Sequence, residues 1–125
     1  MSNPKKLDKV YIRDLSLRCI IGIFPDERTK KQDIIINVTM EADLHNAGKT
    51  DSIDDTVDYK RITKAILAAI EPSSYNLIEK IAQVIADICF TDKLVQTVEV
   101  TIDKPGALRF ARTPAVSIYR ERPAQ

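Results

Sequence analysis

Lysine, tyrosine and carboxylate side chains are the groups in this sequence that could transfer protons, because the chain holds a single histidine, His45. Lys104 directly follows an apolar strand pattern and precedes Pro105-Gly106, so a stiff residue fixes its position and a glycine leaves room for a ligand. A lysine in such a place, partly desolvated or beside a second cation, can have its pKa lowered enough to exchange protons near neutrality. The alternative is an ordinary solvated lysine at a strand end.

Glu79 lies three residues after Asn76, where an apolar helix pattern begins. Asn-x-x-Glu at a helix start is a variant of the capping box, in which both side chains serve the backbone. In the other interpretation, Glu79 and the free N–H groups of the helix N-terminus face a ligand, and the carboxylate accepts two hydrogen bonds from an amino-amide edge. Tyr59 begins the first helix pattern and Glu27 lies in the first polar loop. Taken alone, either is an ordinary surface or boundary residue.

Motifs for metal-dependent or nucleophilic chemistry are missing from the sequence. One histidine is too few for a three-histidine zinc site. Cys19 and Cys89 lie far apart within apolar patterns, which predicts two buried thiols rather than a disulfide. The sequence holds no Gly-rich phosphate loop, Cys-x-x-Cys pair, serine nucleophile elbow or dinucleotide fingerprint. We therefore expect neither a metal site nor a bound cofactor.

The length of 125 residues and the mass of 14.1 kDa are typical of a single domain, expected to span residues 1–125. The 19 Lys+Arg nearly balance the 18 Asp+Glu, so the net charge of +1 gives no reason to expect binding to nucleic acid or to an anionic membrane. Near the C-terminus, four arginines form a basic run that Glu121 interrupts: Arg109, Arg112, Arg120 and Arg122. The last two of them are expected in a solvated tail. No apolar stretch could span a membrane and the first eight residues lack the apolar centre of a signal peptide, which favours the cytoplasm.

Two strand patterns open the chain. The first covers about residues 9–21, and its apolar residues change parity after Ile12, which predicts a β-bulge near Arg13-Asp14. The second alternates over residues 34–44 between an apolar and a polar face. A polar loop that begins at Gly22 joins the two strands.

Helical spacing dominates the middle of the chain. Residues 46–56 hold turn and capping residues without a period and are predicted to be a loop. From Val57 the pattern becomes helical and ends before Pro72. Its apolar stripe consists of Ile62, Ala65, Ile66, Ala69 and Ile70. A second helix with a broader apolar face extends from Leu77 to Cys89, and strands around residues 98–102 and 116–118 close the chain.

The order β-β-α-α-β-β predicts an α+β fold, a four-stranded antiparallel sheet with two helices on one face. Because two helices cover only one face of such a sheet, the polar face of the second strand must meet water or the sheet of another subunit. A closed ring of subunits would also leave no sheet edge exposed.

Taken together, four segments resemble the dihydroneopterin aldolase family, a pterin-enzyme branch of the tunnelling fold: Gly22-Ile-Phe-Pro-Asp-Glu27, Thr56-Val-Asp-Tyr59, Tyr75-Asn-Leu-Ile-Glu79 and Val100-Thr-Ile-Asp-Lys104-Pro-Gly-Ala107. The resemblance covers about residues 11–120. It implies a lyase of folate biosynthesis, which converts 7,8-dihydroneopterin into 6-hydroxymethyl-7,8-dihydropterin and glycolaldehyde by a retro-aldol reaction. It also implies a homo-octamer of two stacked tetrameric rings, in which four sheets form a barrel and the sites lie between subunits.

The resemblance further implies a role for each matching side chain. The residues assigned to substrate binding are Asn76, Leu77, Ile78 and Glu79, of which Glu79 would anchor the amino-amide edge of the pterin. Lys104 would transfer protons through water, and Tyr59 would protonate or orient the enol-like intermediate. Glu27 would organise the site from a loop of the same or a neighbouring subunit. No metal is needed, because the C=N bond of the dihydropterin ring is the electron sink.

Two alternatives remain beside the aldolase. Residues 31–39 and 107–111 also look like the sister family, the dihydroneopterin triphosphate 2'-epimerases, whose reaction is the same bond cleavage followed by re-addition to the opposite face. Pro105-Gly106 favours the aldolase. The second alternative is a non-catalytic assembly protein that binds a purine or pterin, and the four intact site residues argue against it. Zinc-dependent relatives on this fold are disfavoured, because their metal sites need histidines that this chain lacks.

Overall fold

A computed structural model describes residues 6–124 of the chain. The elements in chain order are β1 (Asp8–Ile21), β2 (Gln32–Ala42), α1 (His45–Thr50), the 3-10 turn η1 (Ile53–Asp55), α2 (Tyr59–Ile70), β3 (Ser74–Tyr75), α3 (Ile78–Cys89), β4 (Thr97–Asp103) and β5 (Ala115–Glu121). Residues 1–5, part of the segment on which the signal-peptide expectation rests, lie outside the described residues. Within residues 6–124, no helix is long and apolar enough to cross a membrane.

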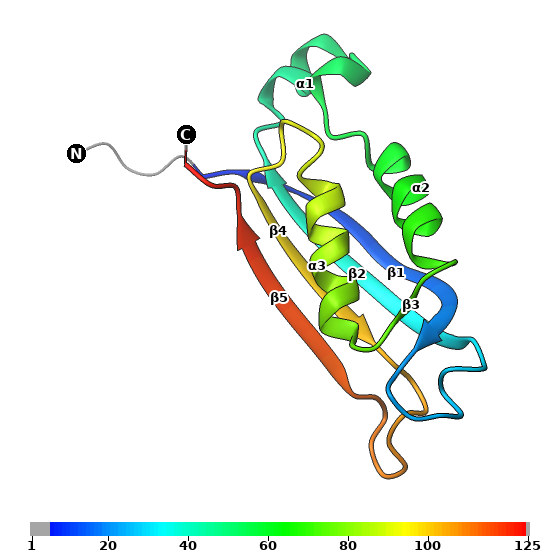
Figure 1. The fold of residues 1–125 in the computed structure, drawn as a ribbon. Helices are drawn as coiled ribbons and strands as arrows, with labels where there is room; N and C mark the ends of the chain where they lie inside the picture. Colours follow the sequence, from blue (N-terminus) through cyan, green and yellow to red (C-terminus); the bar gives the residue numbers. More distant parts are fainter. Residues whose placement is uncertain (1–5, 125) are drawn as a thin grey trace.

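The strands of residues 6–124 form one curved sheet in the order β3-β1-β2-β4-β5 (Figure 1). Neighbouring long strands are antiparallel, whereas β3 runs parallel to the end of β1, pairing with residues 20–21. The predicted four-stranded antiparallel sheet is therefore wrong by one strand, and the sheet is mixed. A strand of two residues is too short to show a period, so its sequence gave no strand signal.

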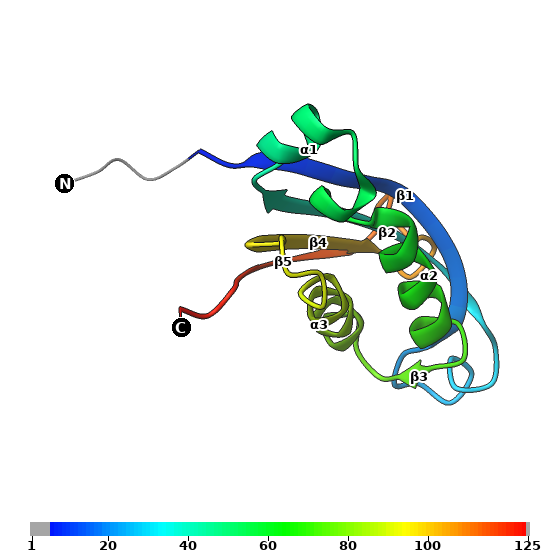
Figure 2. The same cartoon turned by 90° about the horizontal axis from the view of Figure 1, so that it is seen from above.

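Helices α2 and α3 pack against the same face of the sheet, as predicted, and Figure 2 shows the opposite face without a helix. The core between them is aliphatic and holds no buried polar side chain among residues 6–124. Its β2 members alternate as predicted: Ile34, Ile36, Val38, Met40 and Ala42. Ile62, Ile66 and Ile70 are the fully buried part of the α2 stripe.

The predicted bulge in β1 is confirmed, because the β1–β2 register shifts between Ile12 and Leu15. Asp14 adopts the left-handed conformation with φ 54°, and its N–H donates to Asn37 Oδ1 at 2.9 Å. The extra residue turns the second half of β1 so that its apolar side chains face the core. Cys19 and Cys89 are fully buried free thiols, as predicted, and burial raises the pKa of both, that of Cys89 to about 12.

Residues 46–56, predicted to be a loop, contain most of α1 and all of η1. Neither element has a buried residue, so no apolar period marks them in the sequence. Helix α2 begins at Tyr59, as expected for this residue, although helical spacing was expected from Val57 onwards. Asp58 is its N-cap and accepts a hydrogen bond from the Arg61 N–H at 3.0 Å.

Candidate active site

Two loops, residues 22–31 and 104–114, meet at one end of the sheet (Figure 1) and bring Glu27 and Lys104 together. Lys104 Nζ donates to Glu27 Oε2 at 2.6 Å, and the two side chains are 12% and 19% exposed. Lys104 is therefore not a solvated strand-end lysine. Its ion-pair partner is a carboxylate and not a second cation.

The main chain fixes Lys104 at the end of β4. Its N–H donates to the Pro114 carbonyl at 3.1 Å, and its carbonyl accepts from the Ala107 N–H at 3.3 Å. Gly106 has φ 82°, a conformation that favours glycine, so the Pro105-Gly106 pair serves the turn that follows the lysine. The loop therefore closes around Lys104 and presents its ammonium group to Glu27.

Hydrogen-bond donors surround the Glu27 carboxylate. The Phe24 N–H donates to Oε1 at 3.3 Å, and Gln32 Nε2, which also donates to the Ile21 carbonyl at 2.6 Å, lies 3.4 Å from Oε2. The hydrogen bond from Lys104 is the main cause that lowers the pKa of Glu27, and burial opposes it. Glu27 is therefore an ionised acceptor at neutral pH.

Gly22 provides the space that the Glu27 carboxylate occupies. Gly22 is buried with φ 128°, and a Cβ at this position would overlap the carboxylate of Glu27. Any other residue would therefore be strained in its backbone and would also displace the Glu27 side chain. The glycine that begins the Gly22–Glu27 motif has a direct structural reason within the site.

Arg28 attaches the loop of Glu27 to β3. Its guanidinium donates to the carbonyls of Gly22 at 2.9 Å, Tyr75 at 3.1 Å and Ser74 at 2.6 Å. The Gly22 N–H also donates to the Tyr75 carbonyl, at 3.3 Å. The roles of Arg28 and Gln32 were not predicted, because a charged residue in a polar loop and a polar residue at the start of a strand carry no signal of their main-chain partners.

Helix α3 starts at this same end of the sheet (Figure 1), and the predicted capping box at its start is wrong. Leu77 is the N-cap and has no side-chain cap, so Asn76 lies one residue outside the capping position. Glu79 is exposed in the first turn and makes no hydrogen bond or ion pair with any residue of 6–124. Leu77 is 53% exposed, while Ile78 is half-buried against the core. The Glu79 carboxylate therefore has no capping role, and its oxygens are available to a ligand.

Tyr59 lies at the other end of the molecule from Glu79. The residues around it contact the turn that follows α3, because the Asp58 N–H and the Arg61 side chain bind Asp92 and Thr91. Glu79 is in the first turn of α3, so the helix, which spans about 18 Å, separates the two residues. Tyr59 is 59% exposed beside an open groove of about 550 Å³. One chain therefore brings Glu27 and Lys104 together and holds Glu79 at their end, but it does not bring Tyr59 to them.

No cluster of three or more histidine, cysteine, aspartate or glutamate side chains that could hold a metal ion is found in residues 6–124. The polar groups gathered at the Glu27 end are a carboxylate, an ammonium and an amide. Such a set can bind and relay protons, which is general acid–base chemistry.

Comparison with known proteins relates the chain to enzymes that act on dihydroneopterin and its triphosphate. Residues 10–119 match the family described as FolB: Dihydroneopterin aldolase. The dihydroneopterin triphosphate 2'-epimerase of Pseudomonas aeruginosa is 35% identical over 91% of this chain and 93% of its own length. The dihydroneopterin aldolase of Streptomyces coelicolor is 33% identical over 81% of this chain and 85% of its own length.

A solved structure and a longer relative extend the comparison. The crystal structure of Escherichia coli dihydroneopterin aldolase in complex with neopterin has a TM-score of 0.87 and 28% identity, covering 91% of this chain and 99% of that one. The folic acid synthesis protein FOL1 of Dictyostelium discoideum is 40% identical over 91% of this chain, but the chain spans only 17% of that protein's length.

Replacing Lys104 by methionine should raise the pKa of Glu27, because the largest cause of its lowered value is removed while burial remains. A lowered pKa in the folded state stabilises the protein above the unfolded value of about 4.3, and this stability is lost as the pH falls through the folded pKa. The difference in unfolding free energy between wild type and variant should therefore be largest near neutral pH and should shrink below about pH 4. NMR titration of the Glu27 carboxyl carbon measures the pKa itself. Lys93→Met, at an exposed lysine, is the control, and an unshifted Glu27 pKa in Lys104→Met would contradict the assignment.

Proposed function

The chain belongs to the dihydroneopterin aldolase family, and we propose that it is a metal-free lyase that cleaves the side chain of 7,8-dihydroneopterin in folate biosynthesis. The observation that carries this proposal is the shielded Glu27–Lys104 pair, at the end of the sheet where α3 presents Glu79, which has no hydrogen-bond or ion-pair partner among the described residues. Proton transfer and recognition of a polar ring edge are the two tasks of a pterin retro-aldolase, and these residues offer a group for each.

The cleavage needs one proton removed and one returned. Loss of the proton from the side-chain 2'-hydroxyl lets the C1'–C2' bond break, which releases glycolaldehyde and moves the electron pair into the C=N bond of the ring. The enol-like intermediate then takes a proton at C1' and gives 6-hydroxymethyl-7,8-dihydropterin. Lys104 is proposed to carry these protons through a water molecule, and the Glu27 carboxylate at 2.6 Å holds the ammonium in place and accepts from it.

Glu79 is proposed to bind the pterin ring. The amino-amide edge of a pterin presents two N–H donors side by side, and a carboxylate can accept both. Glu79 is suited to this role because it makes no hydrogen bond or ion pair within residues 6–124 and lies at a helix N-terminus, where an anion is favoured. Asn76, Leu77 and Ile78 would form the adjoining wall of the binding site. The neopterin bound to the Escherichia coli relative supports a ligand of this class.

Tyr59 is proposed to enter the site from a neighbouring subunit. Within one chain, α3 lies between Tyr59 and Glu79, so a site with all four residues requires a second copy. Exposed apolar side chains occur at both ends of the molecule, among them Ile53 and Leu77, which an assembly would cover. We propose the octamer of two stacked tetrameric rings, whose four sheets would close a barrel; sedimentation as a monomer at micromolar concentration would contradict it.

Epimerisation of dihydroneopterin triphosphate is the second candidate function. It is favoured by the Pseudomonas aeruginosa relative, which carries that name and is 35% identical over almost its whole length. The chemistry begins with the same C–C cleavage, after which C1' of the intermediate attacks the opposite face of the aldehyde carbonyl and the C–C bond re-forms with C2' inverted. The proposed roles of Lys104, Tyr59 and Glu79 therefore serve either outcome.

Separate incubations with 7,8-dihydroneopterin and with its triphosphate distinguish the two functions. An aldolase should release 6-hydroxymethyl-7,8-dihydropterin and glycolaldehyde, both identifiable by chromatography. An epimerase should instead convert the triphosphate into its 2'-epimer with the carbon count unchanged. If the protein turns over neither 7,8-dihydroneopterin nor its triphosphate, the proposed function is contradicted.

Replacing Glu79 by glutamine should weaken pterin binding roughly ten- to hundredfold, because a hydrogen bond to a charged group contributes about 1.5–3 kcal/mol. The carboxamide also presents a donor where the ligand donates. The melting temperature should change little, since Glu79 has no hydrogen-bond or ion-pair partner within residues 6–124 and its charge in the first turn of α3 contributes at most about 1 kcal/mol. Calorimetric titration with neopterin and a thermal melt of the same variant test both statements, with Glu71→Gln at the exposed end of α2 as the control. A lower melting temperature with unchanged affinity would assign Glu79 a structural role instead.

Mixing two inactive variants should restore activity if Tyr59 and Lys104 of different subunits share a site. Lys104→Ala is expected to lower kcat roughly 10²–10⁴-fold, as for the loss of one general acid–base group. After joint unfolding and refolding with Tyr59→Phe, random assembly leaves both residues intact in about a quarter of such shared sites. The mixture should then reach about a quarter of wild-type kcat. If the mixture is no more active than its parents, the shared site is refuted.

A further inference from the structure

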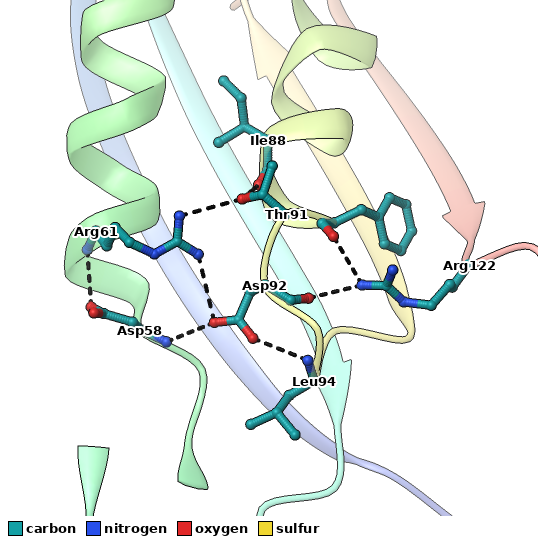
Figure 3. A network of polar contacts seen from close by, with 8 residues as sticks. Asp58, Arg61, Ile88, Thr91, Asp92, Leu94 and Arg122 are labelled. Carbon is teal, nitrogen blue, oxygen red and sulfur yellow. Dashed lines mark hydrogen bonds and ion pairs between the residues drawn. The ribbon is translucent and has the colours of Figure 1, made fainter. Parts of the chain in front are cut away.

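Asp92 connects the turn after α3 to the start of α2, and Figure 3 shows the network around it. Its side chain is 11% exposed, and both carboxylate oxygens accept a main-chain hydrogen bond at 3.1 Å. Oδ1 binds the Leu94 N–H within its own turn, while Oδ2 binds the N–H of Asp58, which is 34 residues away in the chain. The carboxylate is thereby fixed in one orientation and holds one end of α2.

The turn that carries Asp92 is itself attached to the sheet by Arg122. The Arg122 guanidinium donates to the carbonyls of Phe90 at 3.0 Å and Asp92 at 2.8 Å (Figure 3). It also donates to the Val95 carbonyl at 2.8 Å. The expectation of a solvated tail is therefore wrong for Arg122, which is half-buried. Arg120 is exposed as expected, but it lies in β5 rather than in a tail and bonds to Gln83 Oε1 at 2.9 Å. Asp92 thus lies in a turn that Arg122 attaches to the end of β5 and that continues directly from the C-terminus of α3.

Asp58, whose N–H is bound by Asp92, sets the backbone direction from which the Tyr59 side chain projects. Asp58 has φ −84° and ψ 79°, and the Tyr59 N–H donates to the Val57 carbonyl at 3.0 Å, which is an inverse γ-turn centred on Asp58. The N–H of that central residue is the one bound by Asp92. Arg61 adds a second link, because its guanidinium donates to Thr91 Oγ1 and lies 3.9 Å from Asp92 Oδ2.

We propose that Asp92 is a positioning residue for Tyr59, an inference that rests on the proposed role of Tyr59 at the pterin site. The Tyr59 side chain is 59% exposed, so its own packing does little to hold it, and its location follows from the backbone that precedes it. A group that reaches into a neighbouring subunit must be placed by the frame of its own subunit. A displacement of about 1 Å at a reacting group costs up to roughly a hundredfold in rate, so the hold on Asp58 acts on kcat.

Asp92→Asn tests this hold while keeping the size of the side chain. Asparagine keeps one acceptor oxygen but turns an NH₂ group towards either the Asp58 N–H or the Leu94 N–H, and two donors then face each other. Hydrogen exchange should become faster at residues 58–62, and kcat should fall roughly ten- to hundredfold with a much smaller change in KM. Asp87→Asn is the matched control, because it makes the same change on an exposed residue of α3 whose side chain, within residues 6–124, bonds only to Gln83.

A double variant separates positioning from a general loss of structure. If Asp92 acts through Tyr59, Asp92→Asn should cost little further kcat in the Tyr59→Phe background, since the hydroxyl being positioned is already gone. A merely structural role would instead lower kcat by the same factor in both backgrounds, and that result would overturn the inference.

The exchange measurement stands apart from activity. Unchanged hydrogen exchange at residues 58–62 in Asp92→Asn would overturn the inference whatever happens to turnover. If wild type cleaves neither pterin, the proposed function fails, and faster exchange confined to residues 58–62 would still support the hold of Asp92 on Tyr59. If Tyr59→Phe keeps full kcat, Tyr59 has no part in catalysis and the positioning role falls with it.

Discussion

The ion pair between Glu27 and Lys104 is the interaction on which the architecture of the candidate site depends. Removing two charges from water costs several kcal/mol for each ion, and only a close partner and further hydrogen bonds offset that cost. Glu27 has both, since Lys104 lies at 2.6 Å and the Phe24 N–H and Gln32 Nε2 complete its surroundings. Residue 22 then has to lack a side chain, because the Glu27 carboxylate occupies that space. The loops of residues 22–31 and 104–114 have to meet at the same end of the sheet for the pair to form. The ion pair is consequently already formed before substrate binds, and the proposed proton transfer needs no rearrangement of these loops.

The periodic part of this fold was predictable from the sequence, and the part held by polar contacts was not. Alternation in β2 and the parity change in β1 predicted the sheet face and the bulge, because burial leaves a repeat in the residue types. Strand β3 and helix α1 lack such a repeat: the first has two residues and the second has no buried residue. The capping box failed for a different reason, since Asn76 and Glu79 have the right spacing but the helix begins one residue too late for Asn76 to cap it.

The same limit applies to the candidate site. The proximity of Glu27 and Lys104, 77 residues apart, was expected only through the resemblance to the dihydroneopterin aldolase family. Arg28 and Asp92 were not expected at all, because their partners are main-chain carbonyls and N–H groups, which look the same at every position of a sequence. Motifs of individual residues can thus identify what touches a ligand, whereas the residues that support them appear only when the backbone is known.

Helix α3 connects the two halves of the proposed site. Its first turn carries Glu79, and the turn after its last residue carries Asp92, which holds the segment that ends in Tyr59. Between them, its buried face packs against the sheet through Ile81, Ala82, Ile85, Ala86 and Cys89. In a ring where each site takes Glu79 from one subunit and Tyr59 from the next, this helix would fix the distance between two neighbouring sites. A displacement of α3 on the sheet would then disturb pterin binding in one site and proton transfer in the other, so in such a ring the aliphatic core would serve the chemistry as well as the stability of the fold.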